Sequence, residues 1–132
     1  MASIGSPNEG LDNVLGALYT ATFKLLLYTN TQDSLSQSTV LANLTEPTGE
    51  DGYAQITLNG TWSQNNGIFT YDHGSPDDPF WENTGAGDWA VQPAGVAMTD
   101  GTYIVHFKDL VDLVTMIPGK QIIVDMSTGI TV

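Results

Sequence analysis

The chain has 132 residues, of which 41% are hydrophobic, so it is long enough for one domain with a real core and too short for two. It has no cysteine, which excludes disulfides, thiolate metal sites and a cysteine nucleophile. Its net charge is −12, with 15 acidic residues against three lysines, so nucleic acid and anionic membranes would be repelled over the whole surface.

The start of the chain predicts an arm followed by a short helix. Residues 1–10 hold Gly, Pro, Ser and Asn without periodicity, which is typical of a mobile arm and shows neither the basic nor the apolar region of a secretory signal. Apolar residues then recur at helical spacing from Leu11 to Leu18, and an irregular lead-in is the alternative. Residues 21–29 alternate as a strand, with Leu25 and Leu27 on one face and Leu26 and Tyr28 on the other.

The middle of the chain predicts short strands separated by turns. A polar loop over residues 30–38 and a turn at Glu46–Gly49 precede a strand over residues 52–58. Asn59-Gly60 is a strong turn signal, and residues 65–67 (Asn-Asn-Gly) form another before a short strand that contains Ile68, Phe69 and Tyr71. Residues 72–88 contain two prolines and five acidic residues, and we expect a long loop that covers one end of a sheet.

Residues 89–107 predict a β-hairpin. Two apolar runs flank Asp100-Gly101, a dipeptide that favours a two-residue hairpin turn because it tolerates positive φ. With that turn, opposed residues have numbers that sum to 201, so Met98 faces Tyr103 and Val96 faces Val105. One side of the hairpin is then strongly apolar, as in a sheet that packs on one face.

The C-terminal part continues the same pattern. Residues 110–114 fit either a helical turn or an irregular strand, Pro118-Gly119 predicts a turn, and residues 121–126 and 130–132 predict strands. Turn signals therefore recur about every ten residues, as they do in sandwiches and barrels. We expect an all-β fold, a single antiparallel β-sandwich of jelly-roll-like or immunoglobulin-like type over residues 11–132, with a flexible arm or short helix before it.

No residue pattern in the chain predicts catalysis, and we expect neither a cofactor nor a metal. The acidic loop has oxygen ligands, including Asp72, Asp78 and Glu82, but lacks the spacing of a calcium loop. His73 and His106 are far apart in the sequence, and no nucleophile motif accompanies them. We therefore predict that the protein is not an enzyme.

The aromatic residues leave two interpretations open. Trp62, Trp81, Trp89, Tyr53 and Tyr71 fit the interior of the sandwich better than a sugar-binding face. The Phe80-Trp81 pair in the acidic loop either caps the core or contacts a partner.

The order of these features resembles small virion proteins of tailed bacteriophages, either head-decoration (cement) proteins or related tail-associated modules. The resemblance rests on the segments LLLYTN, TEPTGEDGYAQITL, NNGIFTY, VAMTDGTYIVHF and QIIVDMSTGITV, and it covers residues 14–132. Relatives commonly carry an arginine where this chain has Gln55. The acidic loop is also richer in proline and acidic residues than theirs, which weakens the transfer of a particular binding surface.

The resemblance implies a non-enzymatic protein that is made in the host cytoplasm and stabilises the assembled capsid from the capsid surface. Its partners would be the major capsid protein and copies of itself in a dimer or trimer, with no nucleic acid or membrane. The alternative is a tail or fibre module that recognises a host surface glycan. The candidate partner contacts are Ala2, Ser3 and Ile4 of the arm, together with Phe80 and Trp81.

Overall fold

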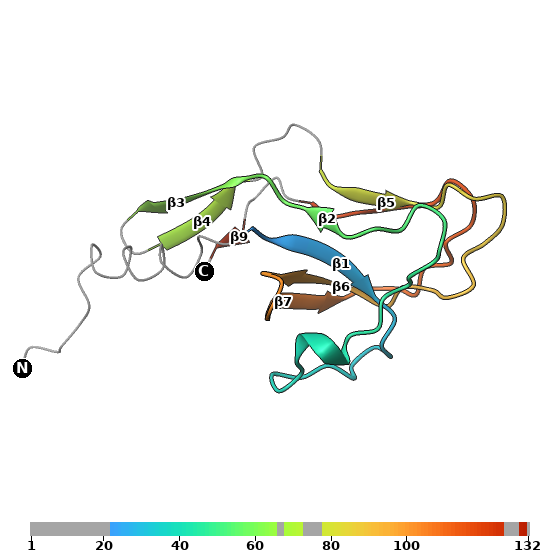
Figure 1. Cartoon of the computed structure of the whole chain (residues 1–132), viewed down its shortest axis with the longest axis horizontal. Coiled ribbons are helices and arrows are strands. Elements are labelled where there is room, and N and C mark those ends of the chain that lie inside the picture. Colours follow the sequence, from blue (N-terminus) through green and yellow to red (C-terminus); the bar gives the residue numbers. More distant parts are fainter. Residues whose placement is uncertain (1–21, 66–67, 73–77, 126–129, 132) are drawn as a thin grey trace, which may run out of the picture. The chain divides into compact units, whose positions relative to one another are not determined.

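The protein is nearly all β-structure, which confirms the predicted class at that level (Figure 1). The computed structural model describes residues 22–65, 68–72, 78–125 and 130–131, and the predicted arm and the 11–18 helix lie outside these residues. The described elements are β1 (Lys24–Tyr28), the 3-10 helix η1 (Leu41–Asn43), β2 (Ile56–Thr57), β3 (Thr61–Asn65), β4 (Ile68–Asp72), β5 (Phe80–Glu82), β6 (Gly95–Thr99), β7 (Ile104–Asp109), β8 (Gln121–Ile123) and β9 (Ile130–Thr131).

The strands form three antiparallel sheets, in the orders β2-β1-β6-β7, β3-β4-β9 and β5-β8. The chain divides into two compact units. The first contains residues 1–21, 59–78 and 125–132, and the second contains residues 22–58 and 79–124. The β3-β4-β9 sheet belongs to the first unit and the other two sheets belong to the second.

In the first unit, β3 and β4 pair along their whole length, from Thr61 opposite Asp72 to Asn65 opposite Ile68. Residues 66 and 67 of the predicted 65–67 turn lie outside the described residues. Strand β9 pairs with the other edge of β4, with Thr70 opposite Thr131.

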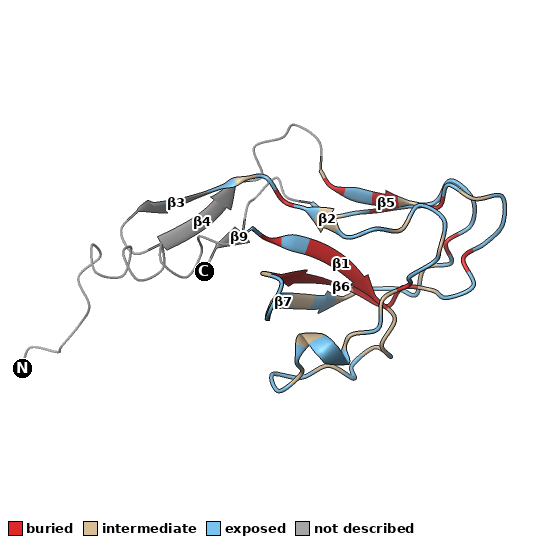
Figure 2. Ribbon diagram, viewed as in Figure 1, coloured by how far each residue is buried: buried red, intermediate tan, exposed pale blue. Residues whose placement is uncertain are grey.

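In the second unit, β1 is buried on both faces, although its sequence alternates. All four residues Leu25–Tyr28 are buried (Figure 2). On one face, Leu26 and Tyr28 form a cluster with Ala94 and Ala97, and Leu35, Leu41, Leu44 and Phe107 pack against this cluster. The loop after β1 therefore covers a face of the four-stranded sheet.

The β6–β7 hairpin is confirmed, but its predicted register is wrong. Paired residues have numbers that sum to 204 over most of the hairpin, as in Ala97 with Phe107, and Met98 faces His106. Four residues, 100–103, separate the strands because side chains close the turn, and a register shift between Met98 and Thr99 moves the pairing by one further residue. Asp100 Oδ1 accepts hydrogen bonds from the N–H groups of Thr102 (2.9 Å) and Tyr103 (2.7 Å), which lower the pKa of Asp100.

Three further expectations need correction. The strand predicted over residues 52–58 covers only Ile56–Thr57, because the segment before it turns at Gly52 (φ 88°). Asn59-Gly60 does not form the predicted turn, and it connects β2 and β3, which belong to different sheets. Residues 110–114 form neither a helix nor a strand.

Candidate binding surface

The predicted 72–88 loop contains a strand that exposes one apolar residue and buries the next. In the β5–β8 ribbon, Phe80 pairs with Ile123 and Trp81 pairs with Ile122. Phe80 and Ile123 are 49% and 60% exposed, whereas Trp81 and Ile122 are only 2% and 7% exposed. Because opposed residues of an antiparallel pair point to the same side, Phe80 and Ile123 form an apolar pair on the outer face.

The same outer face carries a polar pair one step further along. Glu82 pairs with Gln121, and Gln121 Nε2 donates a 3.0 Å hydrogen bond to Glu82 Oε1. We call these four residues, Phe80, Glu82, Gln121 and Ile123, the ribbon face. The ribbon face thus combines two exposed apolar side chains with a carboxylate.

The ribbon is held firmly, although each of its strands has only three residues. The Trp81 indole N–H donates to the Ala54 carbonyl oxygen at 2.8 Å, which ties the inner face to the segment before β2. The Val124 N–H donates to the Pro79 carbonyl oxygen at 2.9 Å, and the Asn83 N–H donates to the Lys120 carbonyl oxygen at 3.0 Å. These bonds extend the ladder past both ends of the paired strands.

Asn83 fixes the loops at one end of the ribbon. Its side chain is buried, and Nδ2 donates to the carbonyl oxygens of Gly87 and Met116, both at 2.8 Å. Its Oδ1 accepts the Gly85 N–H at 2.9 Å. A buried amide whose donor and acceptor groups are both hydrogen-bonded makes the surrounding backbone rigid. The ribbon face therefore lies on a rigid support.

The structure separates the two aromatic residues that the sequence placed together. Phe80 is exposed and can meet a partner, whereas Trp81 is buried and supports the fold. Ala2, Ser3 and Ile4 lie outside the described residues. Sequence reasoning missed Ile123 as the neighbour of Phe80. The alternation of Phe80, Trp81 and Glu82 was the available signal, but so short a strand is hard to distinguish from a loop.

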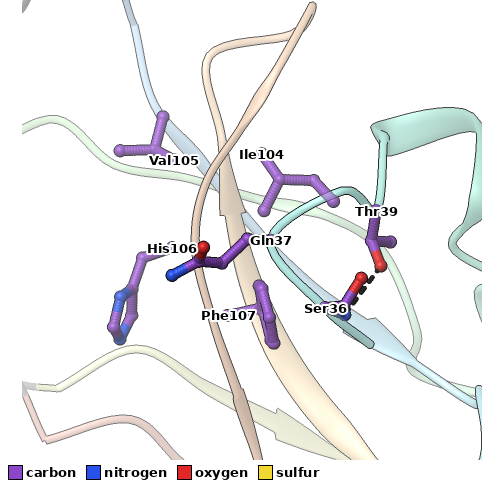
Figure 3. A pocket seen from close by; sticks show the side chains of 7 residues that line it. All are labelled: Ser36, Gln37, Thr39, Ile104, Val105, His106 and Phe107. Atoms are coloured by element: carbon purple, nitrogen blue, oxygen red, sulfur yellow. Dashed lines mark hydrogen bonds between the residues drawn. The ribbon is translucent and has the colours of Figure 1, made fainter. Parts of the chain in front are cut away.

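A shallow groove of about 380 Å³ lies elsewhere on the second unit (Figure 3). Ser36, Gln37 and Thr39 line one side, and residues 104–107 of β7 line the other. His106 is the one titratable residue in this lining, and its side chain makes no hydrogen bond with any residue that the structure describes. The groove therefore offers no acid–base pair.

Among the aromatic side chains that the structure describes, all except Phe80 and Tyr103 are buried or half-buried. Trp89 is buried, donates its indole N–H to the Asp51 carbonyl oxygen at 2.9 Å, and meets the Tyr53 ring edge to face at 6.2 Å. The Tyr53 hydroxyl donates to Glu46, and burial together with this carboxylate raises the pKa of Tyr53. These described side chains form no sugar platform, and the side chains of Trp62, Phe69 and Tyr71 lie outside the described ones.

The acidic residues that the structure describes do not gather into a metal site. No group of three or more potential ligands occurs among them, and the side chains of Asp72, His73 and Asp77 lie outside the description. The Glu50 carboxylate accepts hydrogen bonds from the N–H groups of Ala90 and Val91 at 3.1–3.2 Å.

Within the described part, no helix is long and apolar enough to cross a membrane. No protein-family model, curated protein or solved structure matches the chain.

Proposed function

We propose that this protein is a non-enzymatic virion protein of a tailed bacteriophage, which binds the assembled capsid and stabilises it. The observation that carries the proposal is the exposed Phe80–Ile123 pair on a ribbon anchored by the buried Trp81. Exposed apolar side chains on a rigid support favour binding, because little conformational entropy is lost when they dock. The resemblance of the chain to small phage virion proteins supplies the kind of partner.

Charge restricts the partner further. With a net charge of −12 and only three basic residues, the protein is repelled by acidic surfaces. A complementary docking site on the major capsid protein would be an apolar socket with a basic rim, where the Glu82 carboxylate meets an arginine or lysine. A protein that binds only the assembled lattice stabilises the lattice by mass action.

The remaining features of the proposal follow from the same resemblance to phage virion proteins. We propose that the antiparallel sheets belong to a sandwich of jelly-roll-like or immunoglobulin-like type. The protein would be made in the host cytoplasm, act at the capsid surface and form a dimer or trimer there, with residues 1–9 as a second contact. The glycan-binding alternative gains no support from Trp81 and Trp89, because both are buried.

The test compares assembled shells with unassembled subunits. Shells of the major capsid protein from the same genome are mixed with the purified protein and sedimented, and the free capsid protein is tested in parallel. We expect the protein to sediment with the shells and not to bind the free subunit. Shells that leave the protein in the supernatant at micromolar concentration would reject the proposal.

Two double variants locate the contact. Phe80→Ala with Ile123→Ala should reduce shell occupancy at least tenfold, because it removes both apolar side chains from the ribbon face. The matched control is Val111→Ala with Leu113→Ala, which removes apolar side chains that are 88% and 74% exposed elsewhere on the same unit. Equal occupancy for both double variants would exclude the ribbon face, while a separate deletion of residues 1–9 tests the arm.

A further inference from the structure

The loop between β1 and the Glu46–Gly49 turn is closed at its base by its own hydrogen bonds. The Thr29 N–H donates to the Thr45 carbonyl oxygen at 2.7 Å, and the Thr45 N–H donates to Asn30 Oδ1 at 2.8 Å. Asn30 Nδ2 donates to the Asn43 carbonyl oxygen at 2.9 Å. A surface loop whose ends meet in this way is a compact unit of its own. We call residues 29–45 the cover loop.

Two polar contacts attach the body of the cover loop to the end of β7. The Asp33 N–H donates to Asp109 Oδ2 at 2.7 Å, and Gln32 Nε2 donates to the Leu110 carbonyl oxygen at 2.7 Å. The other carboxylate oxygen of Asp109 accepts the Tyr28 hydroxyl at 2.6 Å. Asp109 therefore joins the loop to the sheet through one charged group. Asp33 is also the one described non-glycine residue with positive φ (62°), a conformation that most side chains disfavour.

The apolar attachment of the cover loop is incomplete. Leu35, Leu41 and Leu44 pack against the Leu26–Tyr28–Ala94–Ala97 cluster, but all three stay only half-buried. The tip of the loop, with Ser36 and Gln37 exposed, leaves the groove of about 380 Å³ between itself and β7 (Figure 3). A segment with few buried contacts and exposed hydrogen bonds opens more readily than the rest of a fold.

We propose that the cover loop is a lid, which opens as a unit about its Thr29–Thr45 base and is latched by Asp109. Opening joins the groove to the apolar face formed by Leu26, Ala97 and Phe107. This inference does not depend on the proposed function, since it concerns a movement within the protein.

The test is hydrogen exchange of the full chain at neutral pH. Asp109→Asn keeps the size of the side chain but removes its negative charge. The Asp33 N–H is then left with a neutral acceptor oxygen, while the Tyr28 hydroxyl can accept from the new amide group. We expect exchange of the amides in residues 31–45 to become about tenfold faster, the factor by which a hydrogen bond to a charged acceptor is stronger than one to a neutral acceptor. Exchange in β5, β6 and β8 should not change. The control is Asp112→Asn, which alters an exposed carboxylate three residues away and should leave the loop unaffected.

A second measurement decides the matter if Asp109→Asn does not fold. The chain has no cysteine, so Ala97→Cys places one thiol beneath the cover loop, at a position that is only 1% exposed. Labelling of this thiol by a soluble disulfide reagent faster than global unfolding, measured on the same variant, supports the lid. Labelling at the rate of global unfolding, or an Asp109→Asn variant that accelerates exchange equally in all strands, would show that the loop is a permanent part of the core.

Discussion

Gly95 leaves the space in which Tyr28 crosses the middle strand of the sheet. Tyr28, Gly95 and Asp109 are neighbours on three adjacent strands, because Gly95 pairs with Tyr28 on one side and with Asp109 on the other. The Tyr28 ring lies over Gly95 and is fully buried, and its hydroxyl reaches Asp109. A Cβ atom at Gly95 would collide with the end of this ring, at Cζ, Oη and Cε2. We therefore expect Gly95→Ala to destabilise the protein strongly.

The size of the destabilisation follows from the interactions that the Tyr28 ring loses when it is displaced. Displacing the ring breaks the hydrogen bond to the Asp109 carboxylate, which is worth about 1.5–3 kcal/mol. Overpacking of the surrounding core adds about 1–3 kcal/mol. The unfolded chain has less conformational entropy with alanine than with glycine at this position, which offsets about 0.5–1 kcal/mol of the loss. The net loss is about 3 kcal/mol, a large part of the roughly 5–15 kcal/mol by which domains are usually stable.

Urea unfolding followed by tryptophan fluorescence measures this loss, and two further variants test its cause. Gly87→Ala is the control, since a Cβ at Gly87 meets no atom within 4 Å, and we expect a change below about 0.5 kcal/mol. In a Tyr28→Leu background the ring is absent, so Gly95→Ala should cost less than about 1 kcal/mol. The same cost for Gly95→Ala in both backgrounds would refute the role of Tyr28.

Three more predictions concern buried groups. Asn83→Ala should lower the free energy of unfolding by about 3 kcal/mol in the same urea assay, because it orphans buried backbone groups; a loss below about 1 kcal/mol would contradict this role. Trp81→Ala should cost about 3–5 kcal/mol and Phe80→Ala less than about 1 kcal/mol, and similar costs would contradict their assignment to opposite faces of the ribbon. Burial and a carboxylate partner raise the pKa of both Tyr28 and Tyr53 above the ordinary value of 10.0, so the stabilisation is complete below pH 10 and is lost as pH rises further. The urea midpoint should therefore be lower at pH 11 than at pH 9, and replacing both tyrosines by phenylalanine should make this difference smaller.

Local sequence signals predicted much of the secondary structure. The hairpin of β6 and β7 follows from the apolar runs on either side of Asp100-Gly101, and β4 follows from the short apolar segment that begins at Ile68. The strand at Lys24–Tyr28 follows from its run of β-compatible apolar residues. These features depend on neighbours in the chain, which is why one sequence suffices to predict them.

The candidate site was predictable only in part. The sequence drew attention to Phe80 because it is an aromatic residue in an acidic, irregular segment. It could not show that Trp81 faces inward, since a three-residue strand has too few alternations to reveal its pairing. Ile123, which is far away in the chain, meets Phe80 only through the β5–β8 register.

By itself, then, the sequence determined a β-rich, cysteine-free and strongly acidic protein, along with the place of its β6–β7 hairpin. The register of that hairpin emerged only in the structure, where the Asp100 side chain captures two nearby amides and a register shift between Met98 and Thr99 moves the pairing further. The tertiary structure also decided why Gly95 must stay small and how Asp109 connects the cover loop to the sheet. These last two relations join β1, β6 and β7, and contacts between segments so distant in the chain leave no periodic trace in the sequence.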